Sequence, residues 1–103
     1  MNEVAPEDAA RTGITMCRVH VWIRGRVQGV WFRDTCSTEA RITGVSGWVR
    51  NCADGRVEAV FEGPEPAVER MVRWCETGPP RAIVSEVERR AERVEHLSGF
   101  RIR

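Results

Sequence analysis

A short segment with two glycines, Gly25–Arg33 (GRVQGVWFR), joins an alternating apolar run at 17–24 to a helical pattern. Alternation is typical of a half-buried strand, so this segment predicts a tight strand-to-helix turn. Such a turn directs several backbone N–H groups at one point, and the helix adds its own unpaired N–H groups and partial positive charge. Arg33 falls in the first helical turn, where a cation is disfavoured unless an anion is present. The segment therefore predicts a phosphate-binding site.

The spacing of apolar residues predicts the other elements of the chain. Gly44 ends the first helix, Ala53–Gly55 predicts a hairpin turn, and Gly63–Pro66 and Gly78–Pro80 bound the second helix. The predicted strands are 17–24, 45–51, 56–62, 81–90 and 100–102, and the first helix is 32–42. The residues expected to face the core are Phe32, Cys36 and Ala40 in the first helix and Val68, Met71, Val72 and Cys75 in the second.

This order, strand–helix–strand–strand–helix–strand with a short final strand, predicts an α+β fold. It is the split pattern of a ferredoxin-like sandwich (βαββαβ), an antiparallel sheet with two helices on one face. In that topology the third strand lies between the first and the second, which therefore run in the same direction. The ends of those two strands meet at one edge, ~10 Å apart, or two strand spacings. We therefore expect the side chains of Arg33 and Asn51 to face the same gap between these two strand ends.

Composition excludes several classes of function. A chain of 103 residues forms one domain, and its net charge of +1 gives no electrostatic support for a nucleic acid or membrane partner. The chain has no lysine, which excludes a Walker-type phosphate loop and Schiff-base chemistry. Its four cysteines are scattered without a Cys-x-x-Cys motif, so no zinc site is expected. Buried free thiols are the expected state, although the spacing leaves a disulfide open.

The N-terminal segment differs from the remainder of the chain. Residues 1–15 contain Glu3, Glu7 and Asp8 and lack the apolar stretch of a signal peptide. No run approaches the length of a transmembrane helix. We therefore expect a disordered acidic leader over 1–15, a folded domain over 16–103 and a cytoplasmic location.

Each candidate residue also has a purely structural interpretation. Arg33 offers a planar set of donors that matches phosphate oxygens, but a surface arginine can equally pair with Asp34 or Ser37. Asn51 can hold a water molecule through its amide, or it can start the turn at Asp54. The side chain of Gln28 is expected to face solvent rather than a ligand.

Other polar and aromatic residues show no pattern of a second site. His20 and His96 have no partner at metal-ligand spacing, and both are expected to be structural or solvated. The glutamates at 86, 88, 92 and 95 are typical of a solvated surface rather than an acid–base pair. The four tryptophans could stack nucleic acid bases, but the aromatic RNA-binding signature is absent. Trp31 is expected to pack beside the glycine segment, and Trp48 in or on the sheet.

Taken together, several short motifs make the chain from Cys17 to Arg103 resemble the acylphosphatases. These motifs are Gly25–Arg33, Gly47–Asn51 (GWVRN), Asp54–Gly55, Gly63–Glu65, Gly78–Arg81 and Phe100–Ile102. The resemblance implies a ferredoxin-like hydrolase that acts on acyl phosphates without metal or cofactor. It also implies that the phosphate-binding arginine is Arg33 and the water-positioning asparagine is Asn51. The implied backbone cradle for phosphate is Val27, Gln28, Gly29, Val30, Trp31 and Phe32.

The chain departs from the family pattern in its acidic leader, at Trp31, where a smaller residue is common, and at Arg103. None of these departures falls on Arg33 or Asn51.

The expected partner is a small acyl phosphate, and the expected state is a monomer that binds neither nucleic acid nor membrane. Two alternatives remain open: a non-catalytic module that binds anions or a protein partner, and the corresponding domain of larger carbamoyl-phosphate-using maturation proteins. A free-standing domain is expected over the latter, because no zinc-finger cysteines follow.

Overall fold

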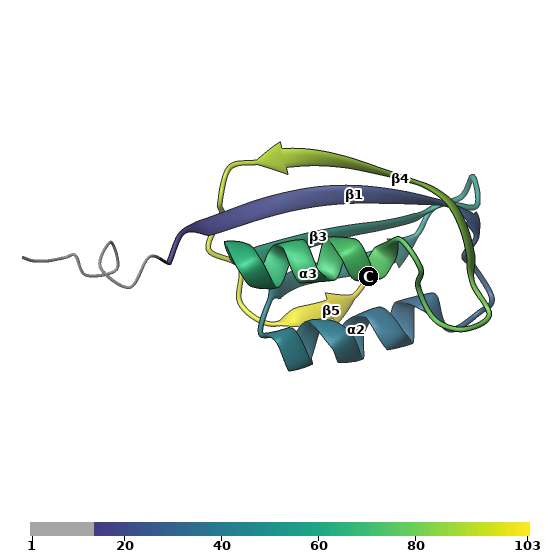
Figure 1. Ribbon diagram of the computed structural model, residues 1–103, viewed down its shortest axis with the longest axis horizontal. Coiled ribbons are helices and arrows are strands. Elements are labelled where there is room, and N and C mark those ends of the chain that lie inside the picture. The colour runs from purple at the N-terminus through teal and green to yellow at the C-terminus, as the bar shows by residue number, and fades with distance from the viewer. Residues whose placement is uncertain (1–13) are drawn as a thin grey trace, which may run out of the picture.

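Two helices cover one face of a five-stranded sheet (Figure 1). The computed structural model describes residues 14–103, so most of the expected leader lies outside the described residues. The strands are β1 (Met16–Arg26), β2 (Ser46–Asn51), β3 (Val57–Pro64), β4 (Ile83–Glu92) and β5 (Phe100–Ile102). The helices are α2 (Phe32–Thr43) and α3 (Glu65–Cys75). The predicted order of elements is confirmed, and their ends shift by one or two residues.

The sheet order β4-β1-β3-β2-β5 places β3 between β1 and β2. Because both neighbours pair antiparallel with β3, β1 and β2 run in the same direction, as predicted. β5 pairs parallel with β2, so the sheet is mixed and only its first four strands are antiparallel throughout. The parallel direction of β1 and β2 brings the loop after β1 and the end of β2 to one edge of the sheet.

The apolar faces of the strands and helices form one core. In β1 the alternate residues Val19, Val21 and Ile23 are buried under the helices, as the alternation predicts. The expected apolar residues of both helices are all buried. All four cysteines are free thiols; those in the two helices, Cys36 and Cys75, are fully buried.

The edge strand β4 joins β1 through an irregular register next to the glycine segment. The pairing shifts between Arg24 and Gly25, so Gly25 lies opposite Val84. Gly25 has a φ of 123°, and a Cβ at this position would overlap the carbonyl oxygen of Ile83 and approach the Ser85 nitrogen to 2.8 Å. The close approach of the two backbones at Gly25 thus holds the end of β1 against β4.

The helix-free face of the sheet carries a cluster of paired charges. The ring nitrogens of His20 contact Glu92 (Nδ1 to Oε2, 2.8 Å) and Glu58 (Nε2 to Oε2, 2.6 Å). Arg18 is buried and donates from Nε to Glu92 (3.0 Å) and from Nη1 to Glu62 (3.4 Å). The expectation of a solvated surface is therefore wrong for Glu92. His20 is structural, as expected, because it links two strands that flank its own.

Aromatic rings lie beside this charge cluster. The ring of His20 stacks on Trp22 at a centroid distance of 4.0 Å and meets the edge of Trp48 at 5.6 Å. Guanidinium groups lie over both indoles, Arg90 over Trp22 at 5.1 Å and Arg103 over Trp48 at 4.2 Å. The two tryptophans on this face are thus each engaged by neighbours of the same chain.

The backbone approach at Gly25 predicts a large effect for Gly25→Ala. We expect a loss of at least about 3 kcal/mol in the free energy of unfolding, because the clash adds to the strain of a positive φ. Gly55→Ala is the matched control: its φ is 95°, and a Cβ there meets nothing within 4 Å. The control should lose only about 1–2 kcal/mol. Equal losses in urea unfolding would contradict the packing role of Gly25.

The charge cluster predicts that acid destabilises the fold. The Arg90 guanidinium, with Arg18 and His20, lowers the pKa of Glu92 from 4.5 to about 2, although burial opposes the shift. A carboxyl group whose pKa is lower in the folded state stabilises the fold above its unfolded pKa, and this contribution disappears as pH falls from about 4.5 to about 2. Glu92→Gln should therefore flatten the dependence of unfolding free energy on pH in this window. Unchanged slopes in urea titrations at several pH values would refute this assignment.

Candidate active site

The helix α2 begins without a side-chain cap. Its N-cap residue, Trp31, has left-handed backbone angles (φ 69°, ψ 22°) and makes no capping hydrogen bond. The first backbone bond into the helix runs from the N–H of Thr35 to the carbonyl of Trp31 (3.0 Å). Within the described part of the chain, the N–H groups of residues 28–34 donate to no backbone carbonyl. This turn therefore presents several unpaired donors at the positive end of a helix.

Packing fixes the position of this helix start. The ring of Phe32 is buried and meets Trp74 of α3 edge to face, with centroids 5.2 Å apart. Gly78, after α3, lies so close that a Cβ there would come within 2.6 Å of the Phe32 ring. The donors of α2 are thus held by contacts within the core rather than by solvent-exposed residues.

A pocket of about 200 Å³ lies at this turn. This volume is below that of sites for drug-sized ligands, roughly 300–1,000 Å³, and suits a small group such as phosphate. Its lining residues are Val27, Gly29, Trp31, Phe32, Arg33, Asp34 and Asn51. The parallel direction of β1 and β2 explains why Arg33 and Asn51, distant in sequence, line the same pocket.

Arg33 lies in the first turn of α2 and is exposed. Across residues 14–103 it takes part in no ion pair or side-chain hydrogen bond, so the structural alternative of pairing with Asp34 or Ser37 is not formed. The Ser37 hydroxyl is buried without a partner. The guanidinium of Arg33 is therefore available to a ligand in the pocket.

Asn51 is the last residue of β2 and is half-buried. The turn that follows is closed by other groups: the Cys52 N–H donates to the Arg56 carbonyl (2.8 Å), and the Arg56 N–H donates to Asp54 Oδ1 (3.1 Å). In the described residues the Asn51 side chain makes no hydrogen bond within this turn. Its amide is thus not needed to form the hairpin.

The side chain of Gln28 does not face solvent, contrary to expectation. Its Nε2 donates to the carbonyl oxygens of Cys52 (2.8 Å) and Arg56 (2.9 Å). These bonds connect the glycine segment to the hairpin after β2, and so connect the two sides of the pocket. Sequence reasoning missed this role because it depends on a contact between segments 24 residues apart.

The expected cradle residues divide between two hollows. Val27, Gly29, Trp31 and Phe32 line the pocket with Arg33 and Asn51. Gln28 and Val30 instead line a neighbouring hollow, which also includes Gly29. The six expected positions are thus shared between two adjoining hollows, and Gly29 lines both.

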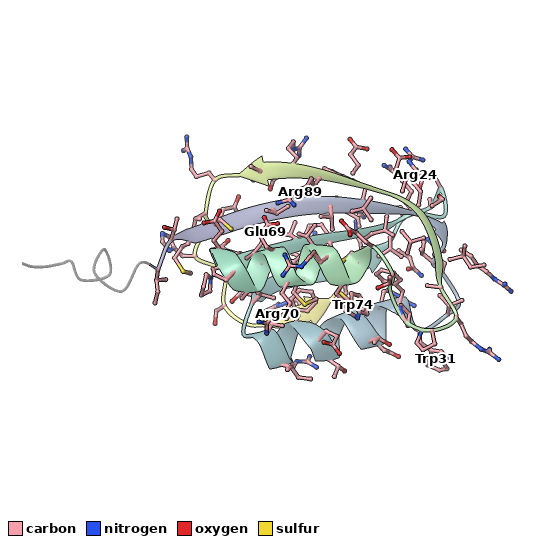
Figure 2. All side chains as sticks on the ribbon, in the orientation of Figure 1. Arg24, Trp31, Glu69, Arg70, Trp74 and Arg89 are labelled. Atoms are coloured by element: carbon pink, nitrogen blue, oxygen red, sulfur yellow. The ribbon has the colours of Figure 1, made fainter. Side chains whose placement is uncertain are left out.

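Two lining residues differ from the sequence expectation. Trp31 is 70% exposed rather than packed beside the segment, and it projects from the end of the molecule where the chain enters α2 (Figure 2). Asp34, which the sequence offered only as a pairing partner of Arg33, is itself a lining residue of the pocket. The position of Asp34 in the first helical turn is the sequence signal that could have placed it at the site, because acidic residues favour this location. Among residues 14–103, no group of three or more His, Cys, Asp or Glu side chains could hold a metal ion.

The Gln28 bonds predict that Gln28→Glu destabilises the protein at neutral pH. A carboxylate has no donor, so the carbonyl oxygens of Cys52 and Arg56 each lose one of their two donors and face a negative charge. We expect a loss of about 1–3 kcal/mol in urea unfolding. The deficit should shrink as pH falls toward about 4.3, because a carboxyl group that faces carbonyl oxygens has a pKa raised above its unfolded value and regains one donor when it is protonated. Gln28→Met, which removes the bonds without adding charge, should show no such recovery. A Gln28→Glu protein as stable as the original at pH 7 would contradict this role.

Comparison with known proteins agrees with the fold. The family model described as Acylphosphatase matches residues 19–102. An acylphosphatase of Synechococcus sp. is 59% identical over 86 residues, which cover 84% of this chain and 92% of that protein. The solved acylphosphatase of Coxiella burnetii superposes with a TM-score of 0.82 at 38% identity, covering 85% of this chain and 93% of that one. The acylphosphatase of Bacillus subtilis gives 0.81 at 36% identity, covering 85% and 98%. The chain therefore belongs to the acylphosphatase family.

Proposed function

We propose that this protein hydrolyses small acyl phosphates to a carboxylate and inorganic phosphate. One observation carries the proposal: Arg33 and Asn51 line a single small pocket beside a turn with unpaired N–H groups. The names of its relatives, acylphosphatases of about 50–59% identity, support the same reaction. No helix in residues 14–103 is long and apolar enough to span a membrane. We further propose that the protein acts in the cytoplasm as a monomer.

The phosphoryl group binds first. Its non-bridging oxygens accept hydrogen bonds from the Arg33 guanidinium and from backbone N–H groups at the start of α2. These are charge-assisted bonds, which are short and directional, so they orient the phosphorus atom as well as bind it. The packing of Phe32 against Trp74 keeps the donors in place before the ligand arrives. Preorganised donors of this kind stabilise charge on the equatorial oxygens in the transition state.

Asn51 holds the attacking water. Its carboxamide both donates and accepts, so it can fix a water molecule opposite the leaving oxygen. The water oxygen forms a bond to phosphorus, and the bond from phosphorus to the acyl oxygen breaks. The acyl group leaves as a carboxylate with the electron pair and needs no proton. A phosphate oxygen accepts a proton from the water, which a loose transition state permits. Inorganic phosphate is the second product.

The two central residues predict different kinetic defects. Arg33→Gln should lose about 10³-fold or more in kcat/KM for benzoyl phosphate and should no longer be inhibited by inorganic phosphate. Asn51→Ala should lose about 10²-fold or more in kcat while phosphate still inhibits, because only the position of the water is lost. Ultraviolet absorbance of benzoyl phosphate gives both rates, and a chelator should leave them unchanged. Near-normal turnover by Asn51→Ala would exclude its water-holding role.

Asp34→Asn tests the route of the proton. If a phosphate oxygen takes the proton, this variant keeps kcat within about tenfold of the original, since the carboxyl group then has no chemical task. A loss as large as that of Asn51→Ala would assign the base to Asp34.

The same assays on the original protein test the alternative function. If it hydrolyses no acyl phosphate while phosphate still binds, the chain is a non-catalytic anion-binding module.

A further inference from the structure

A second hollow adjoins the proposed phosphate pocket. It has a volume of about 500 Å³ and is lined by Arg26, Gln28, Gly29, Val30 and Arg81. Gly29 lines both hollows, so they meet at this residue. A Cβ at Gly29 would meet nothing within 4 Å, which means that the space over this glycine is open. A ligand seated in the first pocket can therefore extend across Gly29 into the second hollow.

The fold brings the two arginines of this hollow together from separate segments. Arg26 is the last residue of β1 and pairs with Ile83, the first residue of β4. Arg81 lies two positions before Ile83, within a turn that the Ala82 N–H closes by donating to the Pro79 carbonyl (2.9 Å). The irregular register at Gly25 sets this alignment, because it shifts the pairing of every later residue of β1.

Neither arginine is neutralised within the described residues. Arg26 and Arg81 are both exposed, and neither forms an ion pair with any residue of 14–103. No carboxyl group lines the hollow. Arg24, two positions before Arg26, is different: its Nε lies 3.7 Å from Glu86 Oε1. Two uncompensated guanidinium groups in one hollow favour an anionic ligand, since each presents donors that match carboxylate or phosphate oxygens.

We infer that Arg26 and Arg81 form a second anion subsite, which selects acyl phosphates whose acyl group itself carries a carboxylate or phosphate. This inference rests on the proposed function, because the first pocket must hold the phosphoryl group. The acyl group crosses Gly29, and its distal anion contacts the two guanidinium groups. A neutral acyl group forms no ionic contact with these two guanidinium groups. Arg26 and Arg81 thus determine specificity and take no part in the bond-breaking step.

Matched substrates test this subsite. Benzoyl phosphate has a neutral acyl group, whereas 4-carboxybenzoyl phosphate and 4-phosphonobenzoyl phosphate carry a distal anion on the same ring. The original protein should show a higher kcat/KM for the two charged substrates. The double variant Arg26→Gln/Arg81→Gln should lower the charged-to-neutral ratio of kcat/KM about tenfold, because it removes two exposed ion pairs with the ligand, and kcat/KM for benzoyl phosphate should change little. The charged substrate whose kcat/KM falls further in the double variant carries the anion that the subsite prefers.

Two controls separate a local contact from a general charge effect. Arg24→Gln removes the same charge from β1, and Arg24 does not line the hollow, so this variant should leave the ratio unchanged. Arg26→Lys/Arg81→Lys retains both charges and should keep most of the preference. A ratio that falls equally in Arg24→Gln, or one unaffected by the double glutamine variant, would overturn the subsite. Failure to hydrolyse any of the three substrates would instead overturn the proposed function.

Discussion

The antiparallel pairing of both β1 and β2 with β3 is the constraint on which the site depends. It makes β1 and β2 parallel, so the turn after β1 and the last residue of β2 reach the same edge of the sheet. A hairpin in place of this arrangement would put Arg33 and Asn51 at opposite edges. The Gln28 amide then connects the two sides by binding carbonyl oxygens of the hairpin after β2. The pocket is thus a consequence of topology, and the Gln28 bonds join the segments on its two sides.

Much of the fold could be predicted from the sequence because its signals are local. Alternation along β1 and the apolar spacing at Val68, Met71, Val72 and Cys75 reflect which face of each element is buried, and the structure buries those residues. The shared pocket of Arg33 and Asn51 was also predictable, since it follows from strand order alone. Their proposed chemical roles rest on the resemblance to the acylphosphatases and on this shared pocket.

The features that sequence reasoning missed all depend on distant contacts. The bonds of Gln28, the pairing of Glu92 with Arg18 and His20, and the irregular register at Gly25 join residues from different elements. A lone glutamine or glutamate has no periodic signal that distinguishes a buried, bonded side chain from a solvated one. Trp31 was misplaced for a related reason: its left-handed backbone turns the indole outward, and residue type alone does not predict that backbone.

The distribution of charge explains how one small domain can both fold stably and bind an anion. On the helix-free face, arginines and glutamates are paired, and the pKa of Glu92 is lowered because its charge is compensated by Arg90, Arg18 and His20. At the edge where β1 ends, arginines line hollows without such partners. Pairing them internally would remove the donors that an anion needs, whereas leaving the buried Arg18, Glu58 and Glu62 unpaired would destabilise the sheet. A protein with a net charge of only +1 can therefore still present guanidinium groups to an anion at one edge, because many of its other arginines are paired with carboxyl groups.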